Sequence, residues 1–165
     1  MPKRKMQPGM HLSTMNARAE TIGEKPTYMK SWRDAKTCLL PMKWFYEPNY
    51  ESGKAERWAI GMADGEPFCV AGLWREWEEE EGGFAFSFTQ ITINADEHLL
   101  MKRFHKPGDE KRSLVIIPRS EYGDWLNAGS PESARTMLAH YPANLMKAWP
   151  AAKEYSRKSQ TASLF

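Results

Sequence analysis

The sequence predicts an α+β domain whose strands form a mainly antiparallel sheet with short helices between them. Two observations carry this expectation. Apolar runs with a two-residue period come in hairpin-like pairs, and short segments with helical spacing separate those pairs. The clearest strand covers residues 84–94, FAFSFTQITIN, where Phe84, Phe86 and Phe88 alternate on one face.

Two further strands precede this one. The runs RWAIGMA (57–63) and EPFCVAGLW (66–74) are apolar, and the Asp64-Gly65 pair between them predicts a tight hairpin. The acidic run at residues 78–81 is expected to form the solvated tip of the next hairpin, and a metal or partner site there is the weaker alternative.

The N-terminal part of the chain predicts one helix and one long strand. In residues 26–35, PTYMKSWRDA, Trp32 lies three and four residues after two other apolar side chains, which indicates a short helix. Residues 37–47, TCLLPMKWFYE, then form a strand in which Pro41 marks a bulge or a sheet edge. Pro48 is expected to end that strand because proline has no backbone N–H to donate.

Helix-start signals recur in the second half of the chain. The segment Asn94-Ala95-Asp96-Glu97 has the pattern of a capping box and predicts a helix over residues 96–104. Residues 114–117, LVII, are a short buried strand, and Ser130 followed by proline predicts another helix over residues 131–141. Periodicity is lost near residue 151. We therefore expect one domain over residues 1–150 and a flexible tail over residues 151–165.

Composition restricts the classes of function. The 165 residues include 41% hydrophobic and 27% charged side chains, which is typical of a globular chain, and the formal net charge is only +2. A nucleic-acid partner would therefore bind a local basic patch. Cys38 and Cys69 lie in apolar runs without metal-ligand spacing, which indicates buried free thiols in a reducing compartment. The sequence has no signal-peptide pattern and no apolar stretch of membrane-spanning length.

Three polar motifs are candidates for binding or chemistry. Asn16 and Arg18 are two residues apart, so on an extended backbone their side chains share a face, where an amide beside a guanidinium can orient a carbonyl or a phosphate. Glu47 follows three aromatic residues, and a carboxyl held against aromatic rings has a raised pKa suited to proton transfer near neutral pH. His105 lies among Lys and Arg side chains that favour a neutral, proton-accepting imidazole and that can also bind phosphates.

Each motif also has a plainer explanation. Glu47 can be a solvated carboxylate at a strand end, His105 can be a surface histidine in a basic loop, and Asn16 can belong to an ordinary surface loop. The order of the motifs along the chain is what favours the functional interpretation.

That order resembles one protein family. Asn-Ala-Arg-x-Glu-Thr starts at Asn16, Cys-Leu-x-Pro-x-x-x-Phe-Tyr-Glu ends at Glu47, Phe-Thr follows at residues 88–89, and His105 precedes an arginine and an apolar strand. From about residue 15 to about residue 149 the chain resembles the SOS-response-associated peptidase (SRAP) family, whose members protect abasic sites in single-stranded DNA. The resemblance implies a single SRAP-like α+β domain with a partly barrel-like sheet and flanking short helices.

The resemblance also implies roles for individual residues. In the family an N-terminal cysteine captures the ring-opened sugar aldehyde as a thiazolidine, which is a stable DNA–protein crosslink. Asn16 would orient the sugar and the attacking terminus, Glu47 would shuttle protons, and His105 would help to open the sugar ring. The expected DNA-binding residues are Arg18, Lys102, Arg103, Lys106 and Arg112.

The chain departs from the family pattern near its start and at one strand position. It begins Met1-Pro2-Lys3-Arg4 where the family begins Met-Cys-Gly-Arg, and Trp44 stands where the family has a glycine. Either the true start lies upstream and supplies the cysteine, or the protein is a degenerate paralogue. We favour the first interpretation because Asn16, Arg18, Glu47 and His105 are all retained.

The leading hypothesis is a DNA-repair protein of the SRAP type, a monomer that acts on single-stranded DNA with abasic sites in a bacterial or phage-related cytoplasm, associated with the nucleoid. The alternative is a module that binds single-stranded DNA without covalent chemistry. A stand-alone peptidase is weaker, since no Ser-His or Cys-His nucleophile pair is visible. We expect no cofactor, no membrane partner and no metal, because His11, His98, His105 and His140 lack ligand spacing.

Overall fold

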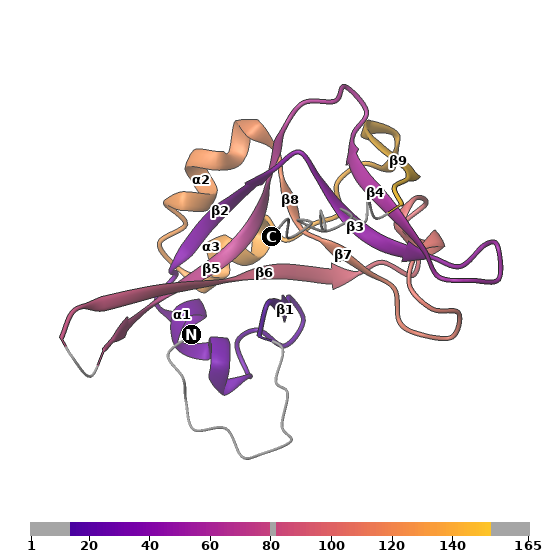
Figure 1. The fold of residues 1–165 in the computed structure, drawn as a ribbon. Helices are drawn as coiled ribbons and strands as arrows, with labels where there is room; N and C mark the ends of the chain where they lie inside the picture. The colour runs from indigo at the N-terminus through magenta and orange to yellow at the C-terminus, as the bar shows by residue number, and fades with distance from the viewer. Residues whose placement is uncertain (1–13, 80–81, 153–165) are drawn as a thin grey trace, which may run out of the picture.

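The computed structural model describes residues 14–79 and 82–152, which form two sheets with short helices around them (Figure 1). The larger sheet contains β1 (Asn16–Arg18), β2 (Thr37–Met42), β5 (Phe68–Glu78), β6 (Phe84–Asn94), β7 (Arg112–Leu114) and β8 (Ile116–Ile117). The smaller sheet contains β3 (Trp44–Asn49), β4 (Glu56–Met62) and β9 (Met146–Pro150). The helices are α1 (Pro26–Arg33), α2 (Tyr122–Leu126) and α3 (Pro131–Thr136), with single 3-10 turns at Met101–Arg103, Arg119–Glu121 and Ala143–Leu145.

β5 is the central strand of the larger sheet. It pairs antiparallel with β2, β6 and β8, and β7 pairs antiparallel with β6. β1 is the exception, because it runs parallel to β6. The path β1-β6-β5-β2 ends on two strands that do not pair with each other, so within the described residues this sheet is open. The predicted α+β class with mainly antiparallel pairing is confirmed, but the strands form two open sheets instead of a partial barrel.

Residues 37–47 form two strands instead of the single one predicted. The chain bends at Lys43, so that β2 joins the larger sheet and β3 joins the smaller one. Pro48 does not end β3, which continues to Asn49 with Pro48 opposite Arg57. Proline is tolerated there because β3 is an edge strand, and the backbone of Pro48 faces the free edge, where its carbonyl accepts a hydrogen bond from the His105 N–H (2.9 Å).

Asp64-Gly65 forms the predicted turn but not the predicted hairpin. Gly65 has a φ of 81°, in the left-handed region that favours glycine, and its N–H donates to the Met62 carbonyl (3.0 Å). The strands on either side do not pair with each other, since β4 lies between β3 and β9 while β5 belongs to the other sheet. The turn therefore carries the chain from the smaller sheet to the larger one.

The helix predicted over residues 96–104 is wrong, because this stretch contains only one 3-10 turn. The N–H groups of Leu100 and Met101 donate to Nδ1 of His98 (3.3 and 3.0 Å) instead of to carbonyls one turn earlier. The Asp96 carboxylate accepts the Lys111 N–H at 2.8 Å. The His98 ring thus accepts two N–H groups that a helix would have bonded to its own carbonyls, while Asp96 binds a residue outside this stretch.

The helix predicted over residues 131–141 begins as expected but is shorter. The Ser130 hydroxyl accepts the Ser133 N–H (3.2 Å), and the helix ends at Thr136. The helix predicted over residues 26–35 and the strand over residues 84–94 are confirmed as α1 and β6. The predicted tail and the acidic hairpin tip lie largely outside the described residues.

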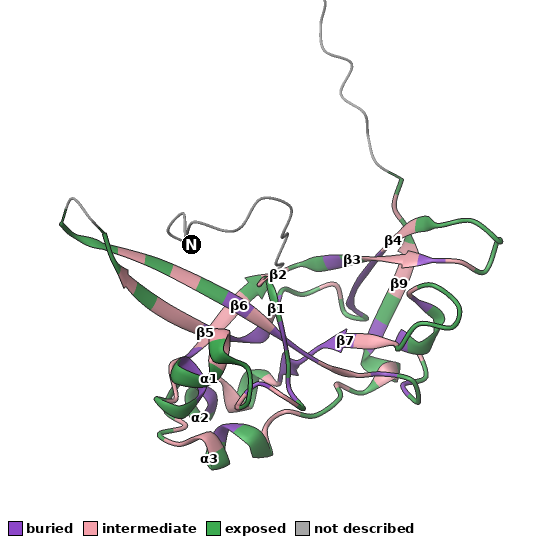
Figure 2. Ribbon diagram, turned by 90° about the horizontal axis from the view of Figure 1, so that it is seen from below, coloured by how far each residue is buried: buried purple, intermediate pink, exposed green. Residues whose placement is uncertain are grey.

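Two apolar clusters hold the elements together. The first packs α1, α2 and α3 against the larger sheet and includes Ile22, Trp32, Leu73, Ile91 and Trp125. The second lies between the two sheets and includes Phe45, Ile60, Val70, Met101 and Phe104. Figure 2 shows that β6 is buried in its middle, whereas the β5–β6 hairpin extends away from both clusters and is exposed or half-buried near its tip. The first cluster fixes β1 and β6, and the second joins β3 to the larger sheet.

Trp125 is the side chain on which the first cluster most depends. It is fully buried, its indole N–H donates to the Cys38 carbonyl (2.9 Å), and its own carbonyl accepts the Thr37 hydroxyl (2.8 Å). Trp125→Ala removes the largest buried side chain and should lower the free energy of unfolding by about 3–5 kcal/mol. Urea denaturation measures this loss. The neighbouring Leu126 is 51% exposed, so Leu126→Ala serves as the control and should change stability by less than about 1 kcal/mol.

Candidate functional site

β3 directs Glu47 into the space between the sheets. Side chains alternate along a strand, so Glu47 shares a face with Phe45 and Asn49, both of which are buried. The Glu47 side chain is only 20% exposed. Burial raises the pKa of this carboxyl, and the charge of His105 offsets part of the rise. The solvated strand-end carboxylate considered as the plainer explanation is therefore wrong, because Glu47 faces inward.

His105 is held against Glu47 from two directions. Its backbone N–H donates to the Pro48 carbonyl of β3 (2.9 Å), and its φ of 63° places the residue in the left-handed region. Nε2 lies 2.8 Å from the Arg112 carbonyl oxygen, and because a carbonyl can only accept, Nε2 carries the hydrogen. The other ring nitrogen, Nδ1, lies 3.6 Å from Oε2 of Glu47.

This geometry makes the Glu47–His105 pair a site for one proton. With Nε2–H committed to Arg112, a neutral imidazole presents the lone pair of Nδ1 to the Glu47 carboxyl. Two lone pairs facing each other repel, so the proton that relieves the repulsion sits either on the carboxyl or on Nδ1. The two side chains are 20–22% exposed, so the pair is in contact with solvent. It can give a proton to a bound group or take one from it.

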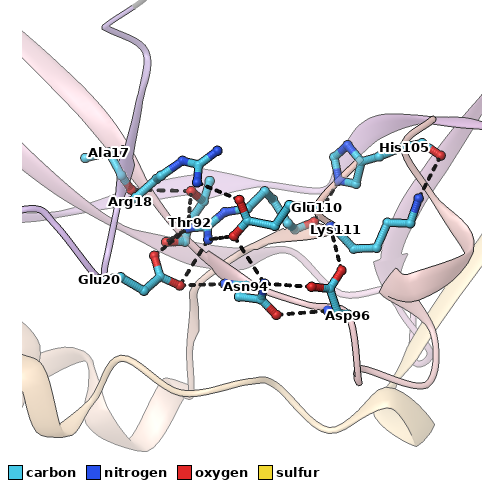
Figure 3. Close-up of polar contacts among 10 residues, drawn as sticks. Ala17, Arg18, Glu20, Thr92, Asn94, Asp96, His105, Glu110 and Lys111 are labelled. Carbon is cyan, nitrogen blue, oxygen red and sulfur yellow. Dashed lines mark hydrogen bonds and ion pairs between the residues drawn. The ribbon is translucent and has the colours of Figure 1, made fainter. Parts of the chain in front are cut away.

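A chain of ion pairs fixes the Arg112 backbone that orients His105. The Arg112 guanidinium contacts Glu20 (2.8 Å) and Glu110 (2.8 Å), and Glu110 also pairs with Arg18. Figure 3 shows Arg18, Glu20 and Glu110 turned toward one another, with His105 beside them. Arg112 also donates to the Thr92 carbonyl (2.8 Å), and its side chain is only 13% exposed. The arginine expected to contact DNA therefore lies inside the protein surface, between two carboxylates.

Glu20 is the carboxylate that anchors this chain of ion pairs to β6. Partial burial raises its pKa, but hydrogen bonds from Arg112 and from the Asn94 N–H outweigh that effect and lower the pKa to about 2. Glu20 therefore remains ionised throughout the neutral range. Sequence reasoning did not single out Glu20 or Glu110, although Glu20 is part of the Asn-Ala-Arg-x-Glu-Thr motif.

The basic residues predicted near His105 differ in whether a carboxylate of the protein is paired with their charge. Arg103 makes a two-pronged ion pair with Glu51 (2.8 and 2.9 Å). Lys102 and Lys106 are exposed, and within the described residues neither takes part in an ion pair. Lys111, in the same loop, donates to the His105 and Lys106 carbonyls instead of to a carboxylate.

Asn16 lies at the start of β1, exposed, on the same face as Arg18. Its carbonyl accepts the Tyr28 hydroxyl (3.0 Å), which ties β1 to α1. Among the described residues no hydrogen bond joins the Asn16 side chain to Glu47 or His105. The structure brings Glu47 and His105 together, and the convergence of Asn16 on the same site stays a prediction.

The described residues contain no group of three or more His, Cys, Asp or Glu side chains that could hold a metal ion, and no helix among them is long and apolar enough to cross a membrane. Cys38 and Cys69 are free thiols that are half-buried instead of fully buried as expected. Burial raises the pKa of the Cys38 thiol to about 11, which keeps it protonated and a poor nucleophile at neutral pH.

The raised pKa of Glu47 makes stability depend on pH. Above the ordinary carboxyl pKa of about 4.3 the unfolded chain loses the Glu47 proton while the folded protein retains it. Wild-type stability should therefore fall as pH rises from this value to the folded pKa, and Glu47→Gln should not share that fall. Urea unfolding across this pH range measures the difference.

The control for this experiment is Glu51→Gln. Glu51→Gln retains Glu47, so its stability should fall with rising pH as that of the wild type does. The exposed Glu51 carboxylate has a pKa lowered by its hydrogen bonds to Arg103, so its removal should add no further trend in this range. A difference between Glu47→Gln and the wild type that stays constant with pH would contradict a raised pKa.

The two arginines bound to Glu110 provide a matched comparison. Arg112→Leu leaves two carboxylates and a backbone carbonyl without their partner. It should lower the free energy of unfolding by about 1.5–3 kcal/mol, as for hydrogen bonds to charged groups. Arg18 is 58% exposed, and Arg18→Leu should cost at most about 1 kcal/mol. Urea unfolding near pH 7 tests both. Equal losses would show that Arg112 is not the centre of the ion pairs.

The chain is similar to proteins of one family. Residues 1–157 match the family described as "SOS response associated peptidase (SRAP)". The chain is 33% identical to "Abasic site processing protein YobE" of Bacillus subtilis over 138 residues, which cover 82% of this chain and 59% of that protein. It is 32% identical to "Abasic site processing protein YoqW" of Bacillus phage SPbeta, with 82% and 58% covered. The chain thus spans less than two thirds of the length of these relatives.

Solved structures agree with this similarity. A crystal structure of a Bordetella bronchiseptica protein has a TM-score of 0.80 and 39% identity, covering 84% of this chain and 65% of that one. A crystal structure of a Bacteroides thetaiotaomicron protein has a TM-score of 0.74 and 26% identity, covering 84% and 59%. By sequence and by fold, the chain belongs to the SOS response associated peptidase (SRAP) family.

Proposed function

We propose that the protein is a DNA-repair protein that binds single-stranded DNA at abasic sites and processes them. Family membership and the names of two relatives, both abasic site processing proteins, support this proposal. The observation that carries it is the Glu47–His105 pair, with Nδ1 and Oε2 3.6 Å apart and the imidazole tautomer set by the Arg112 carbonyl. Opening an abasic sugar to its aldehyde needs proton transfers of the kind that such a pair performs.

The proposed roles follow from the position of each residue. His105 and Glu47 exchange a proton with the sugar hydroxyl and ring oxygen, which breaks the ring C–O bond and releases the aldehyde. Asn16 orients the sugar from β1. Lys102 and Lys106 bind phosphates directly, and Arg18, Arg103 and Arg112 do so after exchanging a carboxylate partner for a phosphate.

The covalent step in the proposal requires an N-terminal cysteine. Its amine adds to the aldehyde carbon and water leaves, giving an imine. Its thiol then adds to the imine carbon, and the proton from sulfur passes to nitrogen, which closes the thiazolidine. Cys38 and Cys69 cannot perform this sequence, because their nitrogens are amides within β2 and β5. The second candidate is a module that binds single-stranded DNA without covalent chemistry, which the exposed lysines without ion pairs, Lys102 and Lys106, favour among the described residues.

Crosslinking to an oligonucleotide with one abasic site tests the proposal. A polypeptide of the printed sequence should bind it with an affinity that falls steeply with salt, yet leave no adduct on a denaturing gel, because an imine hydrolyses. The same domain preceded by a family-type segment that starts with cysteine should form a stable adduct. In that protein Glu47→Gln should slow adduct formation by about a hundred- to ten-thousandfold. A stable adduct of the printed sequence would show that another residue is the nucleophile.

A further inference from the structure

The outer face of the smaller sheet carries an aromatic surface that the Glu47–His105 site does not use. Trp44 and Tyr46 alternate with Glu47 along β3, so they project from the opposite face of the strand. In the register of the sheet, Trp149 of β9 shares a row with Tyr46, and Lys147 shares a row with Trp44. These four side chains, together with Lys43, are called the β3–β9 face below.

Small residues in the central strand leave this face hollow. Ala59 and Gly61 of β4 lie between the rings of β3 and β9, so that Trp44 and Trp149 meet across β4 with ring centroids 6.4 Å apart. A Cβ at Gly61 would lie 3.3 Å from the ring of Trp149, which shows how closely that ring covers the strand. The hollow beside the two tryptophans has a volume of about 400 Å³, and Trp44 and Tyr46 are 42% and 43% exposed.

The charges around the hollow are positive and unpaired. Lys43 lies 5.8 Å from the ring centroid of Trp44, and Lys147 lies 5.9 Å from that of Trp149. Within the described residues neither lysine forms an ion pair, in contrast to Arg103 and its partner Glu51. No carboxylate is among the described residues that line the hollow, and the Lys147 ammonium donates only to the Ala63 carbonyl (3.2 Å). The face thus offers exposed ring surface together with free cations, which suits a ligand that has both flat rings and negative charges.

We propose that the β3–β9 face binds unpaired nucleotides of single-stranded DNA that flank the reactive site, with a base stacked on Trp44 and phosphates near Lys43 and Lys147. Aromatic side chains beside cations are the general means of holding single strands without reading their sequence. The inference rests on the proposed function and adds a second contact region.

The other exposed aromatic row has carboxylates beside two of its three rings, and the cation beside it, Lys36, lies over the ring of Trp74. Phe84, Phe86 and Phe88 are 63–66% exposed on β6, but the residues opposite Phe84 and Phe86 on β5 are Glu78 and Glu76. Carboxylates beside the rings repel a polyanion. Hydrophobic exposure is thus common to both surfaces, and charge distinguishes them.

The path of the DNA is consistent with the fold. β3 is the edge strand of the smaller sheet, and Glu47 directly follows Tyr46 on it. Tyr46 and Glu47 project from opposite faces of β3, so in this proposal the flanking nucleotides and the abasic site lie on the two sides of one strand.

Binding of an undamaged oligothymidylate about 12 nucleotides long tests this inference, since it separates the flanking contacts from the chemistry of the abasic site. Trp44→Ala should weaken binding by about fivefold to 150-fold, the range for loss of one stacked base. Lys147→Glu should weaken binding and reduce the slope of log K against log salt concentration by about 0.7 or more. Fluorescence anisotropy of the labelled oligonucleotide gives both quantities.

Two control variants match these changes. Phe86→Ala removes a ring that is more exposed than that of Trp44 (66% against 42%) from the acidic hairpin. Lys25→Glu makes the same change of net charge as Lys147→Glu, at the exposed start of α1. Both should bind within about twofold of the wild type. Circular dichroism and urea unfolding establish that each variant is folded. If Trp44→Ala is not folded, Lys147→Glu still tests the inference, because it removes no aromatic ring.

The outcomes separate the two proposals. If Trp44→Ala and Lys147→Glu bind the oligonucleotide as tightly as the wild type does, the inference is overturned and the proposed function stands. If the controls lose as much affinity as the face variants, or if duplex DNA of the same length binds as tightly as the single strand, the β3–β9 face is not a stacking surface. If the wild type binds neither undamaged nor abasic single strands at low salt, the proposed function falls together with the inference.

Discussion

The segment that contains Phe104 and His105 is attached to both sheets, and the geometry of the site depends on this attachment. Phe104 bridges to Asn49 at the end of β3, and His105 donates its backbone N–H to the Pro48 carbonyl. The His105 ring then reaches the larger sheet through the Arg112 carbonyl of β7. The buried rings of Phe45 and Phe104 fill the space between the sheets. The sheets are thus held so that an inward carboxylate on one meets an imidazole whose tautomer is fixed by the other.

The arginines near the site hold the protein's own structure together through ion pairs, besides adding positive charge that attracts DNA. Arg18, Arg103 and Arg112 all have carboxylate partners, and Arg112 is the most enclosed of the three. A buried cation needs such partners, because its desolvation is otherwise too costly. A phosphate that approaches these arginines therefore competes with a carboxylate that is already in place. Cations without carboxylate partners, such as Lys102 and Lys147, impose no such competition.

The same reasoning explains why exposed aromatic residues have different meanings in different parts of the molecule. The β5–β6 hairpin and the β3–β9 face both present rings to solvent, but the hairpin places glutamates opposite its phenylalanines. On the smaller sheet the lysines lie over the tryptophan rings. A ring attracts a cation electrostatically, and the pair together presents a surface to which a base and a phosphate are both complementary.

The sequence by itself determined the class of the fold, most strand positions, the α1 helix and the identity of the family. These features depend on local periodicity, such as the alternation of Phe84, Phe86 and Phe88, and on the order of short motifs. Local signals also predicted the turn at Asp64-Gly65 and the cap at Ser130. They overestimated the helix over residues 96–104, because the ring of His98 accepts the N–H groups of Leu100 and Met101 instead.

The tertiary structure alone decided which strands pair and what each site residue contacts. No local pattern assigns β3 and β2 to different sheets, places Glu47 inward beside His105, or surrounds Arg112 with Glu20 and Glu110. The partners of these ion pairs are as far as 92 positions apart in the sequence. Their contacts exist only because the two apolar clusters fix the strands relative to one another, and burial then determines which charged groups must be paired.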